Sequence, residues 1–590
     1  MGANADNERD YMKRILAGLC AVLTFATTGL AERATAAPTV RQLPPATQDD
    51  GATDRIIVKL KAPYRSEAAQ KMAREHTDRL SAVAATQLTA VRTMSDDAQV
   101  LALPHTLHGA ALRGVIDRLR QDPSVEYAFA DAREHLLALP NDPLFASQSY
   151  LQAPNGSTLV TSVNAPGAWD ITRGNGNAVV AVVDGGVRFD HPDLAGRLLS
   201  GYDFIGADCT PGVAGCTVAN QFSTANDGDG RDSDASDPGD WVSQSDIDTN
   251  SIFSGCTKED SSWHGTHIAG IIAAASDNGI GVAGLNWFGA ILPIRVSGKC
   301  GAYRSDVIDG MRWAAGITVP NAPVNARPAR IINISLGSAG RCQESAYQQA
   351  VIDVLAKGAI IVAAAGNEDA AVLQPANCDG VISVGAVRGD GLRTIYSNSG
   401  ANLTIMAPGG DFSSPTNDLL ISTNNAGRTT PQPYSSTGFY DSLAGTSFSA
   451  PVVTGIVSLM LSANPNLSAQ QVSDVLRQTA RPFISLSGFP VCAVEGSNNP
   501  KNNTPCNCTT AACGAGYVDA SAAVTRAFVL GGGVVTPPPP APPPGGGGGG
   551  SSGGGGSLDG AAIVALLAIA FATRRVRSTQ RAPREPRIQQ

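Results

Sequence analysis

Charge is scarce in this sequence. Charged residues make up 16% of its 590 residues, against about 25% in average soluble domains. The formal net charge is −8, whereas a nucleic-acid-binding domain normally carries a basic face or stripe. Apolar residues nevertheless reach 43%, which is more than a wholly disordered chain contains. The composition therefore argues against nucleic acid as a partner. It favours a loop-rich secreted enzyme or surface protein, without choosing between these two.

Histidine is also scarce, and its placement disfavours a metal-dependent hydrolase. Only seven histidines occur, and three of them (His191, His264 and His267) lie after residue 141. A metalloprotease helix carries two histidines four residues apart with an adjacent glutamate. His264 and His267 are three apart, and no glutamate stands between them.

The cysteines lack the spacing of a zinc site. Eleven cysteines occur, and no pair of C-x-x-C motifs or H-x-x-x-H motif accompanies them, as a structural zinc site would require. Cys20 falls in the N-terminal apolar run, which leaves ten. An even number in an exported chain indicates disulfides.

The N-terminus is typical of a secretory signal. Lys13 and Arg14 precede an apolar run over 15–26, and small residues follow over 34–36. This is the order of a basic start, a short apolar core and a small-residue cleavage site. We assign residues 1–37 to a signal peptide, with cleavage after Ala36; a buried helix is the alternative.

The C-terminus ends in a short apolar run between contrasting segments. A Pro-rich spacer over 536–544 and a Gly/Ser-rich spacer over 545–557 precede the run over 561–572, and Arg574 and Arg575 follow it. Twelve helical residues span about 18 Å, short of a hydrocarbon core of about 30 Å. The order of segments nevertheless fits the positive-inside rule. It resembles the GlyGly-CTERM sorting signal of Gram-negative bacteria, in which a rhomboid-type protease cuts near the glycines and type II secretion exports the body. A plain low-complexity tail is the alternative.

Two folded regions lie between these ends. The first shows apolar strand-like and amphipathic helix-like stretches, with strands expected at 56–60, 99–103 and 125–130 and helices at 66–88 and 112–120. We expect the ferredoxin-like order of strand, helix, two strands, helix and strand. A small α+β unit between a signal peptide and a larger domain is placed where a propeptide belongs, although an independent binding domain could occupy the same position.

The second region, beginning at Asn141, alternates fully apolar stretches with helical ones. Strands are expected at 178–183, 290–296, 331–335, 359–363 and 381–387, and helices at 266–275, 347–357 and 451–462. Apolar strands alternating with helices predict an α/β fold whose parallel sheet is covered on both faces. Ligand chemistry in such folds lies at the carboxyl ends of the strands, where Asp184 follows the first strand.

Three short motifs, around His264, Ser447 and Asn367, could supply nucleophilic chemistry. A serine nucleophile needs a base within hydrogen-bond reach and a group that orients the base. Ser447 lies where a loop meets an apolar helix, and Asn367 follows a strand end after a glycine. Taken alone, the first is an ordinary helix cap and the second a turn residue.

Taken together, five motifs resemble those of the subtilisin-like serine proteases, the subtilases. They are Val-Val-Asp-Gly-Gly-Val over 182–187, His-Gly-Thr-His-Ile-Ala-Gly over 264–270, Ser335-Leu336-Gly337, Ala365-Gly366-Asn367, and Gly-Thr-Ser-Phe-Ser-Ala-Pro over 445–451. The His-Pro-Asp-Leu stretch over 191–194 also matches. The resemblance covers about 141–525, and its order of Asp, His, Asn and Ser is the subtilase order.

The resemblance implies a role for each motif. Ser447 would be the nucleophile, and His264 the general base and then the general acid. Asp184 would orient His264. Asn367 and the backbone N–H of Ser447 would form the oxyanion hole. His267 would be structural, packed under its helix.

The resemblance also implies the substrate-binding walls. Ser335, Leu336 and Gly337 would form one wall of the pocket for the residue before the scissile bond, Ala365 and Gly366 the other, and Ala376 its base. Small neutral walls imply an apolar or aromatic substrate residue. An acidic pocket built from Glu368, Asp369 and Asp379 is the alternative.

Carboxylates crowd the stretch between residues 226 and 248, which holds eight aspartates. Clustered carboxylates repel one another unless a cation or water separates them, and Ca²⁺ takes six to eight oxygen ligands. We expect structural calcium there, and a similar loop in secreted subtilases of Gram-negative bacteria implies the same. The expected ligands are Asp227, Asp229, Asp232, Asp234 and Asp237. The stretch has no glutamate at the twelfth EF-hand position, and a solvated acidic loop is the alternative.

The sequence does not determine the disulfide pairing. The resemblance implies Cys256–Cys300 and Cys342–Cys378. Cys209 and Cys216 would close a small loop, and the last four cysteines would pair among themselves.

These expectations define one domain organisation: a signal peptide (1–37), a propeptide (38–140), a subtilisin-like peptidase domain (141–530), a Pro/Gly/Ser linker (531–557), a hydrophobic sorting segment (558–577) and a basic tail (578–590). The expected function is that of a secreted endopeptidase that acts on proteins and removes its own propeptide between 136 and 141. Its expected partners are protein substrates, its own propeptide, the secretion machinery and a rhomboid-type protease. The sequence carries no information on oligomeric state. The rivals are a non-catalytic surface protein of the same fold and a narrow processing protease.

Overall fold

The computed structural model describes residues 53–61, 69–107, 109–131, 139–212, 216–217, 220–414, 418–434, 439–493 and 504–533. The signal peptide predicted at 1–37, the sorting segment at 558–577 and the basic tail at 578–590 lie outside these residues. So do all but the first three residues of the linker predicted at 531–557.

The N-terminal module is a four-stranded sheet with two helices. Its elements follow the order β1 (Thr53–Leu60), α2 (Ala69–Ala84), β2 (Thr89–Thr93), β3 (Gln99–Leu107), α3 (Gly109–Gln121) and β4 (Val125–Ala130). The sheet order is β2-β3-β1-β4, and each neighbouring pair is antiparallel. Strand β2 was not located from the sequence, because it is exposed along its whole length and therefore lacks the alternating apolar pattern of a half-buried strand.

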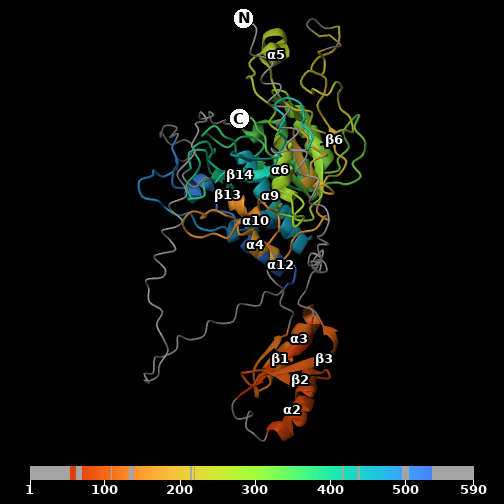
Figure 1. The fold of residues 1–590 in the computed structure, drawn as a ribbon, viewed down its shortest axis with the longest axis vertical. Helices are drawn as coiled ribbons and strands as arrows, with labels where there is room; N and C mark the ends of the chain where they lie inside the picture. Colours follow the sequence, from red (N-terminus) through yellow and green to blue (C-terminus); the bar gives the residue numbers. More distant parts are fainter. Residues whose placement is uncertain are drawn as a thin grey trace, which may run out of the picture. The chain divides into compact units, whose positions relative to one another are not determined.

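The large domain is built on a seven-stranded sheet with the order β13-β12-β11-β10-β5-β7-β6, in which every neighbouring pair is parallel. Figure 1 labels the two edge strands of this sheet, β13 and β6. The strands are β5 (Val180–Asp184), β6 (Tyr202–Asp203), β7 (Ile291–Arg295), β10 (Ile331–Ile334), β11 (Ile360–Ala364), β12 (Ile382–Val387) and β13 (Ile405–Pro408). Every residue of these strands is buried, because helices cover both faces of the sheet.

Alternate residues of β5 show how the sheet divides the core. Val180 and Val182 pack in one hydrophobic cluster, with residues of α6 (His264–Ala273), α9 (Thr446–Ala463), α10 (Ala469–Thr479) and α12 (Ala520–Leu530). Ala181 and Val183 pack in a second cluster, with residues of α7 (Arg304–Ala314) and α8 (Ala346–Ala356). The predicted α/β fold is therefore confirmed.

The remaining α-helices and strands of the described large domain are short and lie outside the main sheet. They are α4 (Ala165–Trp169), α5 (Gln244–Thr249), α11 (Thr510–Cys513), the strand pair β8 (Ser297–Gly298) and β9 (Gly301–Ala302), and the antiparallel pair β14 (Leu420–Thr423) and β15 (Tyr440–Leu443).

Helix α9 is the central helix of the domain. Within the described ranges it is the one helix long and apolar enough to cross a membrane, and 89% of it is buried in the protein. It is therefore a core helix, and its first turn carries Ser447.

Five disulfides join the ten cysteines of the large domain: Cys209–Cys216, Cys256–Cys300, Cys342–Cys378, Cys492–Cys506 and Cys508–Cys513. The second and third are the pairings that the resemblance implies, and the last four cysteines pair among themselves.

Candidate active site

Asp184 and His264 meet at the carboxyl edge of the sheet. Asp184 ends β5 and is buried, and His264 is the first residue of α6. Nδ1 of His264 lies 2.8 Å from Oδ1 and 3.0 Å from Oδ2 of Asp184. Helix α6 approaches this closely because its second residue is Gly265: a Cβ there would lie 2.1 Å from the carbonyl oxygen of Gly186.

The surroundings of His264 favour its charged form. Burial alone disfavours the imidazolium, but the carboxylate of Asp184, and behind it those of Asp240 and Asp237, raise the pKa of His264 above its ordinary value. A base with a raised pKa holds the proton that it accepts more strongly, which suits a group that must be charged during the reaction.

Asp240 also holds the residues just before His264. Its two carboxylate oxygens accept hydrogen bonds from the backbone N and the Oγ of Ser262, both at 2.6 Å. Oγ of Ser262 in turn accepts from the backbone N of His264 at 3.3 Å. From the sequence, Asp240 counted only as one of the eight aspartates of its loop. Its role near His264 was not predicted, because only tertiary packing brings the two residues together.

Replacing Asp240 with asparagine should move the acidic limb of the kcat/KM profile to lower pH by about one unit. The base must be neutral to act, and removing a nearby negative charge lowers the pKa of His264. The measurement is the pH dependence of peptide hydrolysis. Asp248→Asn removes an exposed carboxylate bonded to Gln244 and should leave the limb in place. A limb that stays or moves upward in Asp240→Asn would refute the electrostatic role.

Ser447 lies in the first turn of α9 and exchanges two hydrogen bonds with Ser335. Its Oγ donates to the carbonyl oxygen of Ser335 at 3.0 Å, and Oγ of Ser335 donates to the carbonyl oxygen of Ser447 at 2.8 Å. The second bond has a local cause. Pro451, four residues further along α9, has no N–H, so the Ser447 carbonyl lacks its usual helical partner.

Helix α9 begins earlier than predicted, at Thr446 and not at Pro451. A proline inside a helix removes one backbone hydrogen bond. Here the side chain of Ser335 replaces that bond. The ring of Phe448 packs against His264 and His267, with centroids 5.4 and 4.7 Å apart. The start of α9 therefore adjoins the start of α6.

Asn367 lies three residues beyond the end of β11. Its Oδ1 accepts from the backbone N and the Oγ1 of Thr446, both at 2.9 Å. Since the oxygen of the carboxamide is occupied on this side, its NH₂ group is directed elsewhere. A Cβ built on Gly445 would lie 3.6 Å from Nδ2, which places this donor beside the loop that leads into Ser447.

The two predicted substrate walls begin at the same edge of the sheet. Ser335, Leu336 and Gly337 follow β10, and Ala365 and Gly366 follow β11, which pairs in parallel with β10. The wall beyond β10 continues into Ser338, whose backbone exchanges two hydrogen bonds with Gln374 at 3.0 and 3.1 Å. Ala376, the predicted pocket base, follows Gln374 by two residues and is buried.

Two of the acids considered for an acidic pocket have local partners. Asp369 pairs with the buried guanidinium of Arg393 at 2.5 Å. The carboxylate of Glu368 accepts from Nδ2 of Asn398 at 2.7 Å. Both therefore serve the loop on which they lie.

The other two histidines of the domain have structural surroundings. His267 is fully buried, its Nε2 lies 3.1 Å from the carbonyl oxygen of Leu420, and burial lowers its pKa to about 3. His191 accepts from the backbone N of Asp193 at its Nδ1, and burial lowers its pKa to about 4. Both are neutral at ordinary pH.

The predicted calcium ligands divide into two sets. Partial desolvation and the carboxylates of Asp227, Asp232 and Asp234 raise the pKa of Asp229, so these four lie close enough to repel one another. Asp237 is buried apart from them. There, burial and the neighbouring carboxylate of Asp240 raise its pKa to about 7.

The carboxylate oxygens of these four exposed or half-exposed aspartates are suitable ligands for a hard cation. They do not converge on one point, however. Asp227 forms an ion pair with the buried guanidinium of Arg295, which also binds Asp203. Among the described residues, the one group of at least three acidic, histidine or cysteine side chains that converges on a point is Cys492, Cys508 and Cys513. These cysteines are disulfide-bonded.

A second carboxylate pair was not singled out from the sequence. Asp142 and Asp193 are both buried. Burial, together with the charge of Asp142, raises the pKa of Asp193 to about 6. The partners that these carboxylates have are neutral donors: Nδ2 of Asn278 and the backbone N of Val282 donate to Asp193, and the backbone N atoms of Asp277 and Asn278 donate to Asp142. Asp193 stands in the His-Pro-Asp-Leu stretch, which was the available signal. Two buried carboxylates with neutral partners are suitable ligands for a cation.

A parallel α/β sheet with an aspartate, a histidine, an asparagine and a serine in this order at its carboxyl edge has the architecture of a subtilisin-like serine protease. Sequence comparison agrees: the model of the "Subtilase family" matches residues 175–516. The chain belongs to the subtilase family.

The individual relatives are named as proteases. An "Extracellular protease" of Xanthomonas campestris pv. campestris is 36% identical over 75% of this chain and 66% of that protein. Thermitase of Thermoactinomyces vulgaris is 31% identical over 58% of this chain and 91% of its own length. A solved protease structure from Pseudoalteromonas arctica is 40% identical, has a TM-score of 0.53, and is matched over 66% of this chain and 100% of that one.

The chain spans about two thirds or less of the length of the extracellular relatives that it matches. The chain covers 66% of the Xanthomonas protease and 60% of an "Extracellular basic protease" of Dichelobacter nodosus. The structural comparisons confirm the predicted subtilisin-like fold.

Proposed function

We propose that the chain is a secreted serine endopeptidase that hydrolyses peptide bonds in protein substrates. The observation that supports this most directly is the contact of both Asp184 oxygens with Nδ1 of His264, in a domain whose helix α9 carries Ser447 in its first turn. The names of the extracellular relatives favour export.

The proposed reaction begins with a rotation of the Ser447 side chain. Its Oγ leaves the carbonyl oxygen of Ser335 and donates to Nε2 of His264. Oγ then attacks the scissile carbonyl carbon while His264 takes the proton. The C–N bond breaks as His264 returns that proton to the leaving amine, and water hydrolyses the acyl-enzyme by the same steps in reverse.

Asn367 would stabilise the charge that develops on the substrate oxygen. Its NH₂ group is directed away from Thr446, and the backbone N–H of Ser447 lies in the first turn of α9, where N–H groups have no helical acceptor. Two such donors stabilise the tetrahedral intermediate, and loss of one costs about 10²–10³-fold in kcat.

The module over 53–131 would serve as the propeptide. A split βαβ order ahead of the protease domain, separated from it by the 132–138 segment, is consistent with an intramolecular chaperone. A large parallel sheet is rich in non-local pairings and folds slowly, which gives such a chaperone a purpose. Cleavage between 136 and 141 would be carried out by the enzyme itself, and the C-terminal segment at 558–577 would direct sorting.

The walls after β10 and β11 favour an apolar or aromatic residue before the scissile bond. They are small and neutral, and the nearby Asp369 is already neutralised by Arg393. An acidic pocket selecting lysine or arginine is correspondingly disfavoured.

Calcium would stabilise the domain at one or both carboxylate groups, around Asp229 or between Asp142 and Asp193. The cation would offset the repulsion that raises the pKa values of Asp229 and Asp193. No catalytic step depends on it.

Removing calcium should lower the melting temperature by several degrees. A ligand present at 100 times its Kd stabilises the folded state by about 2.7 kcal/mol. The measurement is thermal unfolding with and without a chelator, with Ca²⁺ and Mg²⁺ added back separately. Asp229→Asn and Asp193→Asn would each abolish the shift if that site holds the ion. A melting temperature indifferent to chelation would refute the calcium proposal.

The decisive test of the proposed function is labelling of purified, matured protein with a serine-directed fluorophosphonate. The site of labelling is mapped by mass spectrometry. Label at Ser447 supports an activated nucleophile. A folded, propeptide-free sample without label would favour the non-catalytic surface protein.

A further inference from the structure

The loop that carries Asn367 has an unusual backbone. Gly366 has φ +108° and Asp369 has φ +48°, both in the left-handed region that favours glycine. A Cβ on Gly366 would lie 2.3 Å from Nδ2 of Asn398. The loop over 365–370 therefore packs directly against Asn398. Its backbone shape depends on the hydrogen bonds that Asn398 makes.

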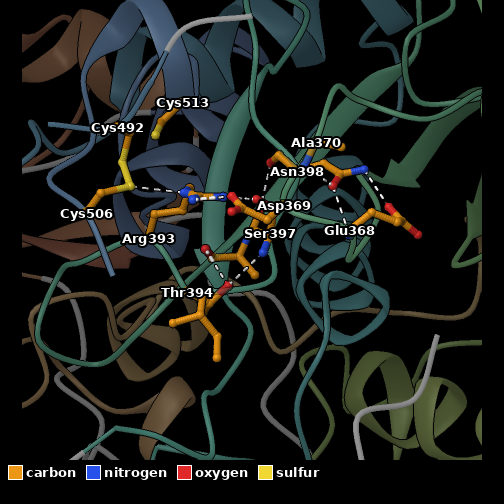
Figure 2. Close-up of polar contacts among 12 residues, drawn as sticks. Glu368, Asp369, Ala370, Arg393, Thr394, Ser397, Asn398, Cys492, Cys506 and Cys513 are labelled. Atoms are coloured by element: carbon orange, nitrogen blue, oxygen red, sulfur yellow. Dashed lines mark hydrogen bonds and ion pairs between the residues drawn. A yellow bond between two sulfur atoms is a disulfide. The ribbon is translucent and has the colours of Figure 1, made fainter. Parts of the chain in front are cut away.

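Asn398 uses its whole carboxamide on this one loop. It is fully buried. Its Oδ1 accepts from the backbone N of Glu368 at 3.0 Å and of Ala370 at 2.9 Å (Figure 2). Its Nδ2 donates to the carbonyl oxygen of Ala365 at 3.1 Å. Nδ2 also donates to the Glu368 carboxylate at 2.7 Å. Two donors and two accepted bonds satisfy an asparagine side chain completely.

The backbone of Asn398 adds a further bond to the same loop. Its N donates to the carbonyl oxygen of Gly366 at 2.9 Å. Asn398 thus binds Ala365 and Gly366 before Asn367, and Glu368 and Ala370 after it. The residue between them is held on both sides.

Arg393 anchors the same two segments from the side. It is buried, its Nη2 donates to Asp369 Oδ1 at 2.5 Å, and its Nη1 donates to the carbonyl oxygen of Ser397, next to Asn398. Its Nε lies 3.1 Å from Sγ of Cys506, which is disulfide-bonded to Cys492. Figure 2 shows this guanidinium between the disulfide and the loop. Arg393, which anchors the segment beside Asn398, is therefore itself in contact with a disulfide.

We propose that Asn398 is a positioning residue for the oxyanion donor Asn367. The inference rests on the proposed function. Asn398 does not contact the substrate; it fixes the backbone on both sides of Asn367, so that Nδ2 of Asn367 is already aimed when charge develops. A displacement of about 1 Å at a reacting centre costs up to about 10²-fold in rate.

The test compares kcat and KM of full-length, self-matured variants on one peptide substrate, with active sites counted by fluorophosphonate titration. Asn398→Ala should lower kcat per titrated site about 10- to 100-fold. KM should change by less than about two-fold, because the oxyanion bond is strong only in the transition state. Asn398→Asp keeps the two accepted bonds but faces Glu368 with a like charge, and should fall between the wild type and Asn398→Ala.

A double-mutant cycle distinguishes positioning from general destabilisation. In an Asn367→Ala background the donor is already absent, so Asn398→Ala should lower kcat by less than about two-fold more. The matched control is Asn325→Ala. Asn325 is also buried, and its carboxamide binds the carbonyl oxygen of Trp313 and the backbone N of Arg327, in the connection after α7. It should lower the melting temperature without changing kcat per titrated site.

The outcomes distinguish a failure of the proposed function from a failure of the positioning role of Asn398. An unlabelled, inactive wild type would refute the proposed function. An active wild type with unchanged kcat in Asn398→Ala, or with a full additional loss in the Asn367→Ala background, would refute the positioning role alone. If Asn398→Ala fails to fold, the same cycle with Asn398→Asp decides the question.

Discussion

Replacing Ser447 with alanine should abolish peptide hydrolysis and leave the propeptide attached. Loss of a triad nucleophile lowers kcat by on the order of 10⁶-fold. The neighbouring hydroxyls of α9 have other partners, since Oγ1 of Thr446 is bonded to Asn367 and Oγ of Ser449 to the carbonyl oxygen of Ala407. The exchange also removes the Ser447 Oγ bond to Ser335. It retains the reciprocal bond from Ser335 to the backbone carbonyl of residue 447, so the helix start should persist. The measurements are hydrolysis of a peptide substrate and the N-terminal sequence of the purified protein, expressed in a protease-free host.

The control for this experiment is Ser335→Ala. It removes the bond to the Ser447 carbonyl but leaves the nucleophile, so the protein should still mature and react with fluorophosphonate. If Ser447→Ala matures to the same N-terminus as the wild type, self-cleavage is refuted. If it hydrolyses peptide at a comparable rate, the assignment of the nucleophile is refuted.

Replacing Asp184 with asparagine should lower kcat by about 10⁴-fold while the protein folds normally. The backbone N of Gly185 donates to Oδ1 of Asp184 at 2.8 Å, so the oxygen of an asparagine would stay on that side. Its NH₂ group would then face Nδ1 of His264, from the position where Oδ2 lies 3.0 Å away. The amide oxygen at the Oδ1 position can accept from Nδ1–H at 2.8 Å, whereas the NH₂ group selects the tautomer in which Nδ1 accepts. In that tautomer the imidazole proton is on Nε2, and Nε2 cannot take the proton of Ser447.

The measurement is kcat per folded protein, together with the rate of fluorophosphonate labelling. Asp190→Asn is the matched control: it removes an exposed carboxylate that pairs with Arg188 on the same loop and should leave kcat within about two-fold. Asp184→Asn enzyme that retains a tenth or more of wild-type kcat would show that His264 does not depend on this carboxylate.

The fold was predictable wherever burial on both faces leaves a continuous apolar run. The run over 178–183 predicted β5 and placed Asp184 at its end, because a strand covered on both sides has a nearly continuous apolar sequence. Strand β2 was missed for the opposite reason: it is exposed along its length and nothing in its composition distinguishes it from a loop. The start of α9 was predicted too late because Pro451 is ordinarily a helix boundary, and its missing N–H is compensated only through Ser335, which is far away in sequence.

The candidate site was predictable as far as short motifs extend. The motifs around Asp184, His264, Asn367 and Ser447 contain the groups expected to react. The residues that support them have no local signature. Asn398 reaches the loop of Asn367 from about 30 residues away, and Asp240 reaches Ser262 from 22 residues away. Such contacts follow from the packing of the whole domain, which no window of sequence contains.

The last described helix sets a practical lower limit on the size of a usable fragment. The family match ends at residue 516, but Val518 donates its backbone N to Met406 on the edge strand β13 at 2.9 Å. Val524 and Ala527 of α12 lie in the same hydrophobic cluster as α9. An expression clone stopped at the match boundary would omit both the outermost backbone pairing of the sheet and one wall of the core. A recombinant protease domain should therefore be cut after Leu530, in the glycines that follow, and not at the point where recognisable sequence similarity ends.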